Sequence, residues 1–157
     1  MIGVIPNPTR ELTVQFSNEQ VQTAMSNLSK YLIGSGVGNY IQHQYDGVIG
    51  QLELVKTEFL SLGVSIMVTA NAVAENQTKL HVEVRRQVGS FDQSYEVTQA
   101  KSHLDKVVSG LSTLLQNPES ADQFDAEEVK AQSEKQTNSS LLVGALVFGL
   151  ILLAVML

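Results

Sequence analysis

The stretch LGVSIMVTANAVAENQTKLHVEVR, residues 62–85, decides the fold class, because its apolar residues alternate with others on both sides of one turn. Before the turn at 75–77, every second residue from Leu62 to Ala74 falls on one face. After it, Leu80, Val82 and Val84 share a face, and charged or polar residues lie opposite. Two alternating runs joined by a short polar turn predict an antiparallel hairpin. The narrowing to alanine near the turn suggests that a helix packs closely there.

Shorter segments before this hairpin add three strands and a helix. Residues 11–17 alternate, with apolar side chains on one face, and residues 40–46 and 51–59 have the composition of strands. Ser17-Asn18-Glu19-Gln20 is a capping box, in which Ser17 caps the helix and Gln20 reaches back. Apolar residues then recur at helical spacing as far as Leu32, before three closely spaced glycines.

A longer helix follows the hairpin. From about Ser94, apolar residues recur at positions 97, 100, 104, 107, 111 and 114, and Asn117-Pro118 ends the pattern. At ~1.5 Å per residue this helix is about 30 Å long, enough to cross a small sheet. The order β-α-β-β-β-β-α therefore predicts an α+β domain over residues 11–116. We expect an antiparallel sheet of about five strands with two helices on its one apolar face.

In this order of elements, residues 11–116 resemble one half of the TATA-box-binding protein saddle, or a reduced helix-grip domain. The resemblance is one of topology and is carried by the succession of strand, helix, four strands and long helix. Because one topology serves many functions, the resemblance implies a fold and no activity, cofactor or partner.

The rest of the chain divides into three segments. Residues 1–10 form an extended lead-in with two prolines. Residues 117–140 form a polar linker with six acids and two lysines, for which the sequence permits both a solvated helix and a disordered spacer. Residues 141–157 carry no charge and predict a single C-terminal transmembrane helix, since about 17 apolar residues are the lower limit for a span.

The expected transmembrane helix has its own candidate residues. Ala145 and Gly149 form a small-xxx-small pair, which favours helix self-association and a homo-oligomer. No export signal precedes the domain, and Lys130 and Lys135 precede the span, so we expect a single-pass protein with its N-terminal domain on the cytoplasmic side. The membrane-anchor residues are Leu141, Val143, Leu146, Phe148, Leu150 and Leu153.

Charge and composition exclude several classes of function. The net charge is −6, and the ten lysines and arginines are scattered, so nucleic acid is not an expected partner. The chain has no cysteine, which excludes disulfides, thiolate nucleophiles and cysteine-based metal sites.

No catalytic, cofactor-binding or metal-binding set emerges from the motifs. The glycine-rich run at 34–38 follows a helix and precedes a strand, the reverse of a phosphate-binding loop. His43, His81 and His103 fall on two strands and the last helix, without ligand spacing. No serine lies in a nucleophile motif. Alternation turns Arg86 toward the apolar face, where it could meet an anionic ligand or extend its head to solvent.

These features favour a non-enzymatic, membrane-tethered interaction domain, a subunit or accessory factor of a membrane protein assembly. Its expected partners are the membrane bilayer and one or more proteins in that membrane. The alternative is a small-ligand or lipid-binding carrier, with an apolar cavity between the 94–116 helix and the sheet. A cavity large enough for a ligand would distinguish the second interpretation from the first.

Overall fold

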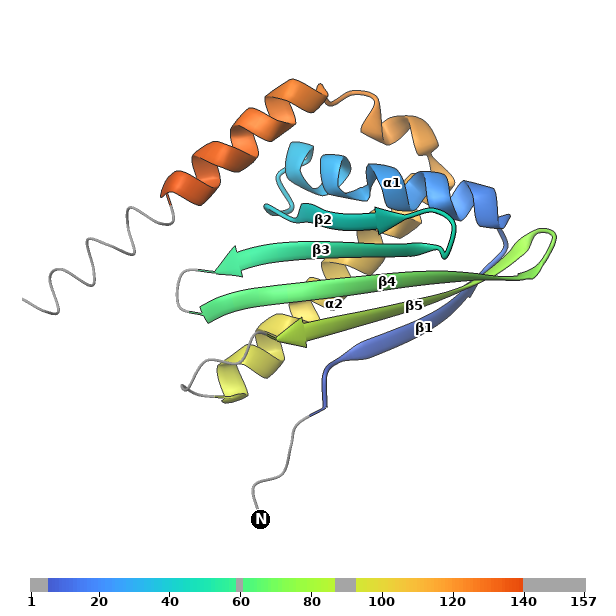
Figure 1. Ribbon diagram of the computed structural model, residues 1–157, viewed down its shortest axis with the longest axis horizontal. Helices are drawn as coiled ribbons and strands as arrows, with labels where there is room; N and C mark the ends of the chain where they lie inside the picture. Colours follow the sequence, from blue (N-terminus) through green and yellow to red (C-terminus); the bar gives the residue numbers. More distant parts are fainter. Residues whose placement is uncertain (1–5, 59–60, 87–92, 140–157) are drawn as a thin grey trace, which may run out of the picture.

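The computed structural model describes residues 6–58, 61–86 and 93–139, and these form a sheet with helices packed against it (Figure 1). A further helix covers residues 126–139. The other elements, in chain order, are β1 (Thr9–Val14), α1 (Asn18–Gly34), β2 (Ile41–Asp46), β3 (Gln51–Glu58), β4 (Ser61–Ala74), β5 (Gln77–Arg86), α2 (Gln93–Gln116) and the 3₁₀ helix η1 (Pro118–Ala121).

The sheet has five antiparallel strands in the order β1-β5-β4-β3-β2, so the predicted α+β class and strand number are confirmed. The strands β2 to β5 are joined by successive hairpins. The first strand, β1, pairs with the last strand, β5, and Leu12 lies opposite Leu80. The predicted hairpin pairs Val68 with Val82. The capping box at the start of α1 is also present, since Ser17 Oγ accepts from the Gln20 N–H and Gln20 Oε1 accepts from the Ser17 N–H.

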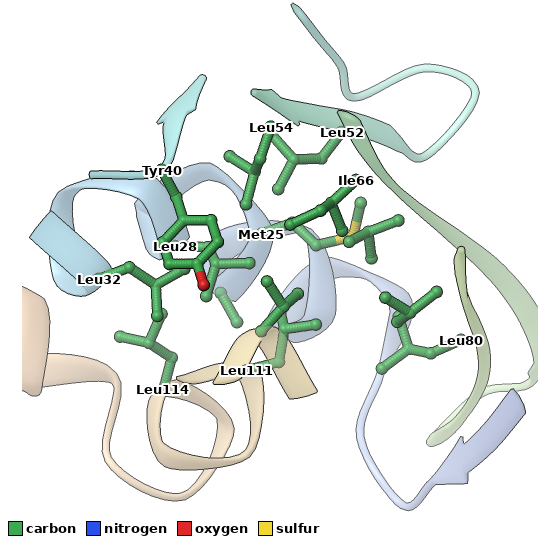
Figure 2. Packing of buried hydrophobic residues seen from close by; sticks show 14 of the residues in the cluster. Met25, Leu28, Leu32, Tyr40, Leu52, Leu54, Ile66, Leu80, Leu111 and Leu114 are labelled. Carbon is green, nitrogen blue, oxygen red and sulfur yellow. The ribbon is translucent and has the colours of Figure 1, made fainter. Parts of the chain in front are cut away.

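One apolar cluster fills the space between the sheet and the helices α1 and α2 (Figure 2). The helices approach closely at Gly110, where a Cβ atom would lie 2.9 Å from Leu32 Cδ2. The sheet contributes Leu52, Leu54, Val64, Ile66, Val68, Leu80, Val82 and Val84 to the cluster. The helices contribute Val21, Met25, Leu28 and Leu32 from α1 and Ala100, Leu104, Val107, Leu111 and Leu114 from α2.

The expectation that a helix covers the alanines near the β4–β5 turn is wrong. Ala70 is buried, but residues 71–76 are all exposed. The two long strands continue past the helices, so the end of the hairpin projects beyond the body of the domain (Figure 1). Alternation assigns a residue to a face of the strand, but it does not say how far along the strand a helix extends.

The acidic segment after α2 is largely helical and packs against α1. Ala121 of η1 and Val129 of the 126–139 helix are buried, and the Phe124 ring lies edge-on to Tyr31 at 6.2 Å between centroids. Asn39 Nδ2 donates to the Ser133 carbonyl and to Thr137 Oγ1, both at 3.2 Å. The sequence left a helix and a disordered spacer open, and the structure has a helix over 126–139.

The expected membrane span requires a correction. Within the described ranges, no helix combines the length and the apolar character that crossing a bilayer requires. The prediction of a single-pass membrane protein with a cytoplasmic domain is therefore wrong on this finding. Its weakness is physical, because 17 residues give about 25 Å of helix and the hydrocarbon core is ~30 Å thick. The expected span 141–157, with its anchor residues and the Ala145–Gly149 pair, lies outside the described residues.

Candidate functional site

An apolar hollow lies between α2 and the edge strand β1. Its volume is about 390 Å³, within the roughly 300–1,000 Å³ typical of small-molecule sites. Polar side chains of Thr13, Gln15, Ser112 and Gln116 also line it. The apolar lining consists of Leu12, Val14 and Phe16 from β1 and its continuation, Leu80 from β5, and Val108, Leu111 and Leu115 from α2.

Two periodicities create this hollow. Alternation in β1 places Leu12, Val14 and Phe16 on the face toward α2, where each is only half-buried. On α2, Val108 comes directly after the buried Val107 and is half-buried against the apolar cluster between helices and sheet. Half-buried apolar side chains on both walls leave apolar surface available to a ligand.

An ion pair joins the same two elements beside the hollow. Arg10 of β1 and Asp105 of α2 approach to 2.6 Å, with side chains 36% and 53% exposed. Arg10 lies two residues before Leu12, and Asp105 lies three residues before Val108. The hollow therefore lies next to an exposed ion pair, which contributes roughly 0–1 kcal/mol to stability.

A buried polar pair lies deeper between α2 and the sheet. The Tyr40 hydroxyl and His103 Nδ1 are 2.8 Å apart, and the two residues are 0% and 1% exposed. Their rings meet edge to face at 5.7 Å between centroids. Figure 2 shows the Tyr40 ring among the leucines of the core. The half-buried Lys56 of β3 places its Nζ 5.3 Å from the centre of the Tyr40 ring.

Local contacts fix Tyr40 where α1 meets β2. Ser29 Oγ donates to the Tyr40 carbonyl at 2.6 Å and accepts from the Gln42 N–H at 3.2 Å. His103 comes from α2, three residues after Ala100 and four before Val107. This spacing places it on the buried stripe, a signal that the sequence analysis did not use. Nothing in the sequence indicated Tyr40 as its partner, because the two residues are 63 positions apart.

Two further hollows lie outside the space between α2 and the sheet. One, of about 180 Å³, lies between α1 and the end of α2 near Pro118. The other, of about 700 Å³, runs between α1, the start of β2 and the 126–139 helix. It is lined by Ile33, Ile41 and Val129 together with Lys30, Lys130 and Glu134. The smaller hollow is below the usual size of a ligand site.

The other face of the sheet carries the charged and polar residues that alternation places opposite Leu80, Val82 and Val84, and these residues form a charge ladder. Lys79 Nζ lies 3.0 Å from Glu11 Oε2, and hydrogen bonding to Lys79 lowers the pKa of Glu11. Arg85 lies 3.0 Å from Glu83, and its hydrogen bond likewise lowers the pKa of Glu83. His81 Nδ1 lies 3.6 Å from Glu11, in agreement with the expectation that His81 belongs to this polar face. Within the described ranges, no group of three or more His, Asp or Glu side chains is arranged to hold a metal ion.

Known proteins resemble this chain by fold rather than by sequence. No family model and no curated protein matches the sequence. A START superfamily protein from Mycobacterium smegmatis matches 71% of this chain and 98% of its own, with 10% identity and a TM-score of 0.53. Ara h 8.0201 matches 70% of this chain and 97% of its own, with 13% identity and a TM-score of 0.53.

A domain of a larger protein gives a similar match. The di-domain ARO/CYC BexL from the BE-7585A biosynthetic pathway matches 73% of this chain, with 10% identity and a TM-score of 0.54. The match covers 47% of the BexL chain. At such identities the likeness shows the fold alone.

These similarities correct the leading functional interpretation. A membrane-tethered interaction domain is contradicted, because the fold of this chain is that of the START superfamily protein and the ARO/CYC domains. The interpretation rested on one terminal segment, while the likeness covers 70–73% of the chain. The expectations that the chain is not an enzyme, binds no nucleic acid, and associates with proteins or with itself stay predictions.

Proposed function

We propose that this chain binds a small apolar or lipid-like ligand between α2 and the sheet and does not transform it. The observation that carries the proposal is the apolar hollow of about 390 Å³ between β1 and α2. It lies between the long helix and the sheet, where the sequence-based alternative expected a cavity. Solved structures with a similar fold include a START superfamily protein and ARO/CYC domains of biosynthetic pathways, which supports a ligand-binding role.

Binding without catalysis agrees with the chemistry of the interior. Tyr40 and His103 are hydrogen-bonded to each other and buried, and neither lines the hollow. The lining of the hollow is mainly aliphatic and also includes threonine, serine and glutamine side chains. Such a surface gains free energy by excluding water from an apolar ligand, at roughly 25 cal/mol per Å² of apolar area buried.

The proposal is tested with the neutral fluorescent probe N-phenyl-1-naphthylamine. The full chain should bind the probe with enhanced fluorescence, and Val108→Trp should weaken binding about tenfold or more by filling the hollow. Val73→Trp is the matched control, because Val73 is 59% exposed on the β4–β5 hairpin. Absence of binding, or equal binding by the folded Val108→Trp protein, would contradict the proposal. The probe should also be recovered chemically unchanged.

A further inference from the structure

The groove between α1 and the 126–139 helix is built from one stripe of each helix. Figure 1 shows the 126–139 helix beside the end of α1 and the start of β2, and the groove that these elements line has a volume of about 700 Å³. This volume is within the range of small-molecule sites. On each helix the lining residues recur at positions i, i+3, i+4 and i+7, so each presents a continuous face to the groove. On α1 they are Ser26, Ser29, Lys30 and Ile33.

Part of the groove lining is apolar. Ile33 of α1 and Val129 of the 126–139 helix are 5% and 8% exposed. Ile41, at the start of the edge strand β2, is 39% exposed and lines the same groove. These three side chains come from three elements, so a ligand in the groove meets apolar surface from each. Covering the exposed isoleucine removes apolar area from water, which favours a ligand with an apolar body.

The two helices each contribute a lysine to the groove. Lys30 of α1 is half-buried, and Lys130 of the 126–139 helix is exposed. Among the described residues, neither ammonium group has an ion-pair or hydrogen-bond partner. The described lining includes one acid, Glu134, so two lysines against one glutamate give it a net charge of +1, whereas the whole chain carries −6. A half-buried, unpaired ammonium group costs free energy that a bound anion would offset.

The hydroxyl groups of the groove are already engaged with the protein. Ser29 Oγ donates to the Tyr40 carbonyl at 2.6 Å, and Thr137 Oγ1 donates to the Ser133 carbonyl at 3.0 Å. Because a hydroxyl has one hydrogen, neither group has a donor left for a ligand. Recognition of an anion in the groove therefore depends chiefly on the two lysines.

We propose that the groove between α1 and the 126–139 helix binds an organic monoanion, a carboxylate or sulfonate with an apolar body. Lys30 and Lys130 pair with the anionic group, and the apolar residues of the groove contact the body of the ligand. A monoanion neutralises the net charge of the lining, whereas a second negative charge would be repelled by Glu134. This site goes beyond the proposed function, because it lies on a different surface from the hollow between β1 and α2.

The test compares 8-anilino-1-naphthalenesulfonate with N-phenyl-1-naphthylamine, which is the same molecule without the sulfonate. Fluorescence titration of the full chain should detect binding of both probes. The double variant Lys30→Met, Lys130→Met should bind the sulfonate about tenfold more weakly and the neutral probe with an affinity changed less than about twofold. Replacing both lysines with arginine should retain sulfonate binding. Lys135→Met is the matched control, because Lys135 is exposed on the same helix and does not line the groove.

The outcomes separate this site from the hollow between β1 and α2. Sulfonate binding that is unchanged in the folded double methionine variant, or lost in Val108→Trp, would overturn the anion site. Binding of the neutral probe alone would also overturn it and leave the proposed function intact. Lysine-dependent binding of the sulfonate alone would support it and overturn the proposed function.

Salt dependence decides the question if the double methionine variant does not fold. On the unaltered chain, raising sodium chloride from about 0.05 M to about 0.5 M should weaken sulfonate binding several-fold, because salt screens the two lysines. Binding of the neutral probe should not weaken. Sulfonate binding of equal strength at both salt concentrations would overturn the anion site.

Discussion

At the scale of single residues, the buried hydrogen bond between Tyr40 and His103 joins α2 to the segment before β2. Both partners are sealed from water, so removing one leaves the other to find a new partner or remain unsatisfied. We expect Tyr40→Phe to lower the free energy of unfolding by about 1–3 kcal/mol. His81→Ala, on the exposed face, should cost less than ~1 kcal/mol. Urea denaturation measures both, and equal losses would contradict the assigned faces.

The glutamates of the charge ladder give a pH dependence of known sign. The folded pKa of Glu83 is lowered by its hydrogen bond to Arg85, below the ordinary value of 4.5. Its contribution is therefore present above about pH 4.5 and is lost as pH falls through the lower folded pKa. The melting temperature of Glu83→Gln should lie below that of the unaltered chain at pH 7, and the gap should shrink as the pH falls below 4.5. A gap that widens on acidification would show the opposite sign.

At the scale of elements, α1 depends on its capping box. Ser17→Ala removes a side-chain acceptor from the first turn and should cost about 1 kcal/mol. Ser26→Ala is the control within the same helix, because Ser26 is exposed and bonds only the Thr23 carbonyl of its own helix among the described contacts. Chemical denaturation should show the larger loss for Ser17→Ala. A loss at Ser26 equal to or greater than that at Ser17 would contradict the role of the cap.

α2 depends on its apolar stripe, and one charge on that stripe should unfold the domain. Leu111 is 1% exposed and contacts the core that α1 and the sheet share. An unpaired carboxylate there costs several kcal/mol, comparable to the whole stability of a small domain. Leu111→Asp should therefore abolish the cooperative thermal transition, while Ser112→Asp, on the exposed neighbouring position, should keep it. Circular dichroism distinguishes the two results.

The elements could be predicted because each depends on neighbours in the chain. The alternation of 62–85 and the capping box at Ser17 are local patterns, and both predicted elements are present. The pairing of Tyr40 with His103 could not be predicted, since it depends on how distant segments pack. The hollow beside β1 also had no local signal. In the sequence its walls are ordinary apolar faces, and only the packing of β1 against α2 leaves Leu12, Val14, Phe16 and Val108 half-buried.

At the scale of the whole molecule, helices and sheet enclose a common interior with an apolar hollow at one edge. The 126–139 helix forms a second, larger groove with α1 and β2, outside that interior. The groove is lined mainly by polar and charged side chains and the hollow mainly by apolar ones, but neither surface could be recognised from the sequence, because each forms only where distant segments pack. The two surfaces lie in different parts of the molecule, so the residues that a bound ligand contacts show which surface it occupies.

The most direct test of the central claim is methyl NMR of the full chain bound to 1-decanol. With isotope-labelled valine, leucine and isoleucine methyl groups, we expect nuclear Overhauser contacts from the ligand chain to Leu12, Val108 and Leu115, which line the hollow between β1 and α2. Contacts to Ile33, Ile41 and Val129 instead would place the ligand in the groove beside the 126–139 helix and contradict the account. Absence of any contact at saturating ligand would also contradict it.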